Sequence, residues 1–234
     1  MDTQIIKKFL DYLKLIENLK VDTAELLLFR GQSSNDPLLP SIARKEPKKD
    51  TTELERQMLK ELIRQTNTKI NGQQFDEWDW LIYAQHYGMK TRLLDWTSNP
   101  LTALWFACSN PYKMNSDSYV YIFLHAEEFL LDKSKEKSPF TRSKTKVLKP
   151  TLNNQRVISQ SGWFTAHKYS KTNERFVDLR SNREMKENIM EVQIPNEIKT
   201  KILEGLNLFG INNKSLFNDI GGICQHINWE FTAR

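Results

Sequence analysis

Residues 85–107 read QHYGMKTRLLDWTSNPLTALWFA, and this stretch decides how the chain folds around a site. Its first part places an amide, an imidazole, two cations and a carboxylate between apolar residues. Its second part has the spacing of a helix, which we expect Ser98 to cap, with Pro100 in the first turn. A core segment does not need so many polar groups. The stretch therefore predicts a site next to the start of a helix.

The residues just before this expected helix suit an anionic ligand. Asp95, Trp96, Thr97 and Ser98 come where backbone N–H groups are unpaired and carry a partial positive charge. A phosphate or a ribose hydroxyl would fit there. The plain alternative is a helix cap with no ligand, and the nearby Arg92 weakens that alternative.

A second candidate group lies earlier in the chain, where an apolar run over residues 24–29 predicts a buried strand. Arg30 follows this run, and Gly31 lets the chain turn away. A guanidinium at such a position can bind phosphate oxygens in a bidentate manner. Equally well, Arg30 could be a structural residue that holds Asp95 in place.

Further polar residues occur beside aromatic ones. His86 can carry a proton, and Tyr87 can stack on a flat ring, although aromatic residues at helical spacing are more often core. Gln160 stands at an expected turn between short strands, where it binds a ligand or only shapes the turn. Glu191 lies within an expected strand, and alternation allows it to point either way. No spacing of His, Cys, Asp or Glu suggests a metal site.

Composition places the chain among globular proteins. It has 234 residues, 39% of them hydrophobic and 11% aromatic, and no apolar run long enough to span a membrane. The N-terminus lacks a secretory signal pattern, and Cys108 and Cys224 are expected to be buried thiols in a cytoplasmic protein. The net charge of +5 is modest. However, seven cations gather between residues 132 and 150, which we interpret as a solvated loop or as a guide for a polyanion. These cations are Lys133, Lys135, Lys137, Arg142, Lys144, Lys146 and Lys149.

The remaining pattern predicts one α+β domain over residues 1–234, with a mixed sheet and helices at both ends of the chain. The expected helices cover 2–20 (within an N-terminal unit 1–22), 50–65, 76–88, residues from 98 onward, a segment after Pro195, and 215–227, the last two in a C-terminal unit 195–234. The expected strands cover 24–29, 119–124, 155–158, 163–166 and 188–194. Residues 31–49 and 132–150 are expected to be loops.

Several of these motifs together resemble the FRG domain, a family named for its Phe-Arg-Gly motif and found largely in bacteria and phages. They are Phe29-Arg30-Gly31, the block from Gln85 to Thr97, the helix with Ala103 to Ala107, and residues 154–164. The resemblance extends from about Glu25 to His167, and more weakly to the segment at Ser215.

The order of these motifs is similar to the arginine, serine and glutamate layout of ADP-ribosyltransferases. The likeness implies a fold of that type, with NAD as co-substrate. Arg30 then matches the arginine that binds the NAD phosphate and nicotinamide ribose, and Thr97 and Ser98 match the strand that shapes the NAD pocket. Gln160 falls near the catalytic glutamate but cannot carry its charge, so either the activity is weak, or Glu191 or Asp95 supplies the charge, or the fold only binds.

Two functions follow as hypotheses. The first is an NAD-dependent ADP-ribosyltransferase, a toxin or phage-defence effector that modifies RNA, DNA or protein, with RNA slightly favoured, and that has a neutralising partner. The second is a nucleotide- or nucleic-acid-binding module without chemistry. We expect the catalytic residues to be Arg30, Gln160, His86 and Asp95. We expect the residues that bind NAD to be Phe29, Arg30, Gly31, Gln32, Tyr87, Arg92, Trp96, Thr97 and Ser98.

Overall fold

The computed structural model describes residues 3–19, 26–66, 75–141, 144–151 and 155–232. Its centre is a seven-stranded sheet in the order β1-β9-β4-β2-β3-β6-β5. All neighbours in it are antiparallel except β1 and β9, which are parallel. The sheet strands are β1 (Thr3–Ile5), β2 (Leu28–Gln32), β3 (Leu93–Thr97), β4 (Ser118–Phe123), β5 (Lys146–Leu148), β6 (Gly162–Ala166) and β9 (Ile189–Ile194), and β7 (Tyr169–Ser170) pairs with β8 (Arg175–Phe176) separately. The prediction of an α+β fold with a mixed sheet is confirmed.

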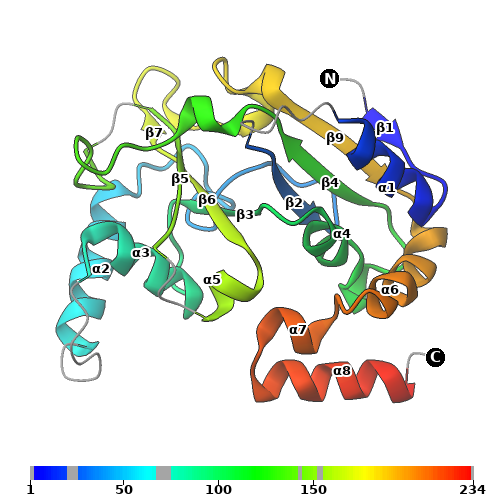
Figure 1. Cartoon of the computed structure of the whole chain (residues 1–234). Coiled ribbons are helices and arrows are strands. Elements are labelled where there is room, and N and C mark those ends of the chain that lie inside the picture. Colours follow the sequence, from blue (N-terminus) through cyan, green and yellow to red (C-terminus); the bar gives the residue numbers. More distant parts are fainter. Residues whose placement is uncertain (1–2, 20–25, 67–74, 142–143, 152–154, 233–234) are drawn as a thin grey trace.

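Helices cover the sheet in groups (Figure 1). The first group, α1, α4 and α6, packs on one face of β2, β4 and β9 and forms the larger apolar core. The second group, α2 and α3, packs near β3 and β6 in a separate core. The last two helices, α7 and α8, close the chain below the sheet in this view. The helix bounds are α1 (Phe9–Asn18), α2 (Thr52–Thr66), α3 (Glu77–His86), α4 (Pro100–Cys108), α5 (Gln155–Ser159), α6 (Lys199–Leu208), α7 (Asn213–Phe217) and α8 (Ile220–Thr232).

Strand β2 shows why its motif contains these three residues. Side chains alternate between the faces of a strand, so Phe29 and Gly31 face α4 while Arg30 points to the opposite side. Phe29 is buried in the core with α4. A Cβ atom on Gly31 would lie 1.9 Å from the carbonyl oxygen of Ala103. Only glycine therefore lets the helix approach this closely.

Strand β3 joins the segments that carry the sequence motifs. It lies between β2 and β6, where Phe29 is opposite Thr97, and Thr97 is also opposite Gly162. Asp95 is opposite Phe164 on β6. The strand owes its place to Leu93, Leu94 and Trp96, which are all buried. Residues from three distant parts of the chain thus meet at one point of the sheet.

Four expectations about secondary structure are wrong. The N-terminal segment begins with a strand, because residues 3–5 pair in parallel with β9, and the helix begins only at Phe9. Residues 155–159 form a helix instead of a strand. Asn99, and not Ser98, caps α4, since its side chain accepts bonds from Leu101 and Thr102. The expected helix over 215–227 is two helices, because Asn218 takes a left-handed conformation with φ 49°.

Two smaller expectations need correction as well. The segment 132–150 is not all loop, because Lys146–Leu148 form β5 at the edge of the sheet. Cys108 is a buried free thiol as expected, but Cys224 is exposed on α8. Parts of the expectations at 2, 20, 24–25, 142 and 154 lie outside the described residues.

No helix in the described part of the chain has both the length and the apolar character needed to cross a membrane.

Candidate functional site

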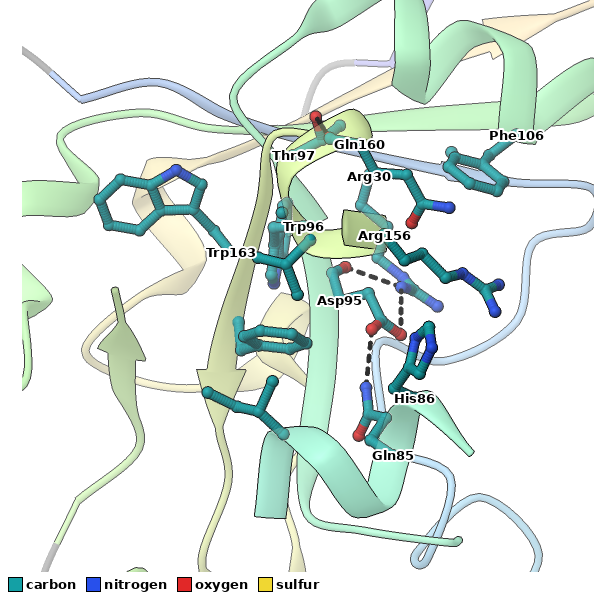
Figure 2. Close-up of a pocket in the computed structure, with 15 residues that line it drawn as sticks. Arg30, Gln85, His86, Asp95, Trp96, Thr97, Phe106, Arg156, Gln160 and Trp163 are labelled. Carbon is teal, nitrogen blue, oxygen red and sulfur yellow. Dashed lines mark hydrogen bonds and ion pairs between the residues drawn. The ribbon is translucent and has the colours of Figure 1, made fainter. Parts of the chain in front are cut away.

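A cavity of about 340 Å³ opens where β2, β3, β6, α3, α4 and α5 meet. Ligand pockets in proteins begin near 300 Å³, so the cavity is large enough for part of a nucleotide. Figure 2 shows that its charged side chains gather on one side of β3 and β6. The cavity is lined by Arg30, Gly31, Ile82, Gln85, His86, Asp95, Trp96, Thr97, Phe106, Arg156, Val157, Gln160, Gly162, Trp163 and Phe164.

Arg30 is held in place from two directions. Its Nε donates to Oε1 of Gln32 at 3.0 Å, and its Nη1 donates to the backbone oxygen of Asp95 at 2.8 Å. The same Nη1 lies 4.0 Å from the Asp95 carboxylate, and the arginine side chain is 14% exposed. Burial lowers the pKa of Arg30 to about 10, partly offset by Asp95. The guanidinium stays charged at neutral pH and would gain from an anion.

Asp95 presents its carboxylate to the opening of the cavity. Its side chain is 65% exposed, although Oδ1 accepts a bond of 2.7 Å from Nε2 of Gln85. Gln85 is fixed in turn by the Thr91 hydroxyl, which donates to its Oε1. Among the described residues that line the cavity, Asp95 is the one carboxylate. Arg30 thus contacts Asp95, as the structural alternative expects, and since both residues line the cavity, an anionic ligand for Arg30 stays a prediction.

Two further basic groups face Arg30 and Asp95 (Figure 2). Arg156 comes from α5, and His86 comes from the last turn of α3. Burial lowers the pKa of His86, and the Arg156 guanidinium lowers it further. The imidazole is therefore neutral at pH 7 and can accept a proton. Two guanidinium groups at one cavity with a single, exposed carboxylate favour an anionic ligand.

The opposite end of the cavity is held by α5 and α7. The Thr97 hydroxyl donates to the backbone oxygen of Gln160 at 2.6 Å, which joins β3 to the turn after α5. The Gln160 side chain donates from Nε2 to the Leu216 carbonyl oxygen at 3.2 Å. The Arg156 guanidinium lies over the Phe217 ring, 4.9 Å from its centroid. Helix α7 thereby contacts both Arg156 of α5 and Gln160 in the turn after it.

Of the other residues expected to bind NAD, some line the cavity and others do not. Gln32 acts through Arg30, and Phe29 is in the core below the site. Tyr87 and Ser98 are both exposed and lie outside the cavity lining, although the Tyr87 ring contacts His86 edge-on. Thr97 and Trp96 line the cavity with Arg30 and Gly31.

Arg92 was expected to bind NAD, but it does not line the cavity, because a buried carboxylate holds its side chain elsewhere. Its Nε donates to Oε2 of Glu55 at 2.8 Å, and its backbone N–H donates to Oε1 at 2.7 Å. The two side chains are 2% and 0% exposed. Arg92 therefore ties α2 to β3 and does not line this cavity.

Glu191 does not line the cavity either. It lies on β9, where Thr3 donates to it at 3.0 Å and Arg180 lies 3.8 Å away. It is opposite Tyr121, which is opposite Arg30, so Glu191 shares a sheet face with Arg30 but lies two strands away. Of the two carboxylates expected to replace a catalytic glutamate, the cavity contains only Asp95.

Several cations of the segment 132–150 pair with carboxylates. Lys133 lies 3.2 and 3.3 Å from Asp76 and Asp79, and Lys144 lies 2.7 Å from Glu184. These pairs reduce the charge available to a polyanion. The interpretation of the segment as a solvated surface gains over that of a guide for nucleic acid.

Sequence reasoning did not place Gln85, Phe106 and Arg156 among the site residues. The signal for Arg156 was hidden by the wrong assignment of a strand. In a helix, residues four apart are neighbours on one face, so Arg156 and Gln160 lie together. The bond of 3.1 Å from the Gln160 N–H to the Arg156 carbonyl closes this turn. In a strand the two residues would be about 13 Å apart.

Comparison with known families identifies one region of the chain. Residues 25–116 match the family model of the FRG domain. The resemblance to that family is confirmed over this region, which contains the Phe29-Arg30-Gly31 motif and the block at 85–107. Searches among curated proteins and among solved structures found no match. The likeness to ADP-ribosyltransferases stays a prediction.

Proposed function

We propose that the cavity binds NAD and that the protein transfers ADP-ribose to a macromolecular acceptor. The observation that carries the proposal is the meeting of Arg30, Thr97 and Gln160 at one cavity. Arg30 and Thr97 match positions of the ADP-ribosyltransferase layout, and Gln160 falls near its catalytic glutamate, although 130 residues separate Arg30 from Gln160. A cap or a turn that had no ligand would not need to join them.

The residues present suit the parts of NAD. Arg30 and Arg156 would hold the pyrophosphate, because guanidinium groups pair well with phosphate oxygens. The Phe106 ring offers a flat apolar surface at the same cavity. Since the cavity measures about 340 Å³, we expect it to enclose the nicotinamide ribose end and to leave the adenosine outside.

NAD supplies the ADP-ribosyl group when its bond between nicotinamide and ribose C1′ breaks, with the electron pair leaving on nicotinamide. Positive charge then develops on the ribose, and Asp95 is the carboxylate placed to stabilise it. The acceptor oxygen or nitrogen that bonds to C1′ must lose a proton. His86, which is neutral at pH 7, is placed to accept that proton. Arg30 keeps the phosphates, and hence C1′, at a fixed position.

The test is incubation of the protein with NAD labelled in the ADP-ribose part, together with total cellular RNA, DNA and protein. We expect label on one class of macromolecule and release of free nicotinamide. Arg30→Ala and Asp95→Asn should each abolish both signals. Arg183→Ala, at an exposed arginine that does not line the cavity, is the matched control and should keep them.

One observation favours a second candidate function, which is nucleotide binding without transfer. Gln160 is uncharged, and its amide donates to the Leu216 carbonyl oxygen. Calorimetric titration with NAD separates the two functions. Binding that is lost in Arg30→Ala, without release of nicotinamide in the wild type, would support a binding module. Absence of both binding and release would overturn NAD as the ligand. A toxin or defence role, a neutralising partner and a cytoplasmic location remain predictions.

A further inference from the structure

A second cavity, of about 410 Å³, shares no lining residue with the cavity around Arg30. It lies where the start of α2, the residue before β3 and the segment of β7 meet. We name it the Arg92 cavity. Its polar lining includes Asp50, Thr52, Glu53, Arg92, Lys168 and Lys171.

Two contacts bring these distant segments together. The ladder between β3 and β6 continues to Arg92, whose carbonyl oxygen accepts a bond of 2.9 Å from the His167 N–H. Lys168 therefore follows directly after the residue opposite Arg92. The Tyr169 hydroxyl donates to the Lys48 carbonyl oxygen at 3.0 Å, which holds β7 beside the segment that leads into α2. The cavity thus lies between elements that other bonds already fix.

The Arg92 guanidinium has one group left without a partner. Its Nε donates to Glu55, and its Nη1 donates to the Pro139 carbonyl oxygen at 3.1 Å. The Phe140 ring covers the guanidinium, with 4.8 Å from its carbon to the ring centroid. Nη2 has no hydrogen-bond partner in the described part of the chain, although the side chain is only 2% exposed. Buried donors rarely stay unpaired, and since Arg92 lines the cavity, an acceptor bound there would pair with Nη2.

Two lysines add positive charge that the protein itself does not balance. Lys168 is half-buried, and Lys171 is exposed in the turn after β7. Neither lysine forms an ion pair with a residue that the structure describes. The two carboxylates of the lining are already engaged, because Asp50 accepts from the first N–H group of α2 at 3.0 Å and Glu53 lies 3.4 Å from Arg56. The two ammonium groups therefore stay available to a ligand.

The N-terminus of α2 lies at the same cavity. This helix has 15 residues, and its dipole places a partial positive charge at the Thr52 end. The Glu53 N–H, the second in the helix, has no acceptor among the described residues. Anions bind at helix ends through such free N–H groups. Here the helix end coincides with the unpaired Nη2 of Arg92, so the two features point to the same kind of ligand.

A phosphate group suits these donors better than a carboxylate does. A phosphate monoester carries a charge of about −1.5 to −2 at pH 7 and has three free oxygens, so it can balance both lysines and also reach Nη2. A carboxylate has one charge and two oxygens. A phosphate group would fill only part of about 410 Å³, which leaves room for the rest of a small molecule. We infer that the Arg92 cavity binds a small ligand through a dianionic phosphate group. This inference does not depend on the binding of NAD at Arg30.

Amide NMR spectra of the whole wild-type chain, recorded during titration with inorganic phosphate, locate the site directly. We expect progressive shifts of the amide signals of Thr52, Glu53, Lys168 and Lys171 at millimolar phosphate or below. Shifts confined to the residues around Arg30, or no shifts at all, would overturn the inference. Because this measurement uses the wild type, it does not depend on the folding of a variant.

Calorimetric titration with inorganic phosphate in an Arg30→Ala background measures the Arg92 cavity without the arginine of the first cavity. Lys168→Met together with Lys171→Met should weaken binding by at least about tenfold, since two charge-assisted contacts are lost. Lys60→Met together with Lys201→Met is the matched control. It removes the same charge at exposed lysines that line neither cavity, and it should bind phosphate as the background does. Circular dichroism must show that both double variants fold.

The outcomes separate this site from the proposed function and identify the source of the phosphate. Equal losses in the two double variants would show unspecific attraction and would overturn the inference. A wild type that binds no NAD but shows the phosphate shifts at α2 would contradict the proposed function alone. Ribose 5-phosphate is the second probe. If it binds more tightly than inorganic phosphate, the ligand is a phosphorylated metabolite, whereas equal affinity identifies free phosphate, and either result supports the site.

Discussion

Arg30 and Arg92 both belong to the motifs that drew attention in the sequence, yet their surroundings give them different roles. Arg30 is 14% exposed and has a partly exposed carboxylate 4.0 Å away. Arg92 is buried and paired with a buried Glu55 at 2.8 Å. A residue type and its spacing cannot distinguish these cases, because the partner of Arg92 comes from a helix some 37 positions earlier.

Glu55→Gln should destabilise the protein strongly. The change leaves the Arg92 guanidinium buried without a charged partner, which typically costs about 3–5 kcal/mol. Urea unfolding measures the free energy of unfolding directly. Glu61→Gln on the same helix is the control, because Glu61 forms a solvent-exposed pair with Arg64, and exposed pairs contribute little to stability. Equal losses in the two variants would contradict a structural role for the buried pair.

Affinity for NAD should depend on pH through His86. Burial and Arg156 lower the pKa of His86 in the free protein. A bound phosphate offsets the effect of Arg156, so binding raises the pKa of His86 back toward its usual range and takes up a proton below that range, while at pH 7 the imidazole can still accept one. Affinity should therefore rise severalfold as the pH falls from about 8 to about 6, by the same linkage that governs stability. Calorimetric titration of the wild type measures this slope.

The same pKa shift acts on stability with a definite sign. The unfolded chain binds more protons at His86 than the folded chain does, so this residue lowers stability as the pH falls below about 6.5. His86→Gln should flatten both the affinity profile and this part of the stability profile. His226→Gln, at a histidine of α8 away from the cavity, should leave the affinity profile unchanged. A slope that survives in His86→Gln would assign the proton to another group.

Individual helices and strands could be predicted from the sequence where signals within the segment itself determine its secondary structure. Asp76 caps the N-terminus of α3, and Gly88 at φ 90° follows the end of the helix, as capping rules predict. The predictions failed where contact with another element determines the secondary structure of a segment. Residues 3–5 are a strand only because β9 offers a free edge. Residues 155–159 are too few for their periodicity to distinguish a strand from a helix.

Gly31→Ala tests the contact between β2 and α4. The new methyl group would lie 1.9 Å from the Ala103 carbonyl oxygen and 2.5 Å from the Ala107 nitrogen. Both are backbone atoms that cannot turn away, so we expect a loss at or above the usual 1–3 kcal/mol for overpacking. Gly162→Ala on β6 is the control, since its nearest atoms would be at an ordinary 3.5 Å. Thermal unfolding of both variants gives the comparison, and similar melting temperatures would refute the argument.

At the scale of the whole molecule, helix α7 near the C-terminus supports side chains that line the same cavity as Arg30 near the N-terminus. Phe217→Ala would remove the ring below Arg156 and leave that guanidinium less ordered. Cation–π contacts contribute about 0.5–2 kcal/mol, so affinity for NAD should fall by roughly twofold to thirtyfold. Phe209→Ala, at a residue that is 64% exposed, should bind as the wild type does. Calorimetric titration decides, and unchanged affinity in Phe217→Ala would show that α7 does not position Arg156.

The sequence revealed only those residues of the candidate site that belong to short local motifs. Arg30, Asp95 and Thr97 lie on neighbouring strands, and short motifs revealed them. The roles of Leu216 and Phe217 depend on a helix that follows Gln160 by more than fifty residues. No local pattern reports such a contact, because it exists only when the complete chain has folded.

The boundary of the FRG match divides the cavity between two walls. Arg30, His86 and Asp95 lie within residues 25–116, while Arg156 and Gln160 lie beyond them. The bond from Thr97 to the Gln160 backbone joins the walls without using either wall's charged side chains. A descendant of this chain that kept the first wall and exchanged α5 would keep an anion anchor and acquire a new preference for the rest of the ligand. If the cavity binds a ligand as proposed, changes in α5 would therefore alter its selectivity while the FRG motif stays the same.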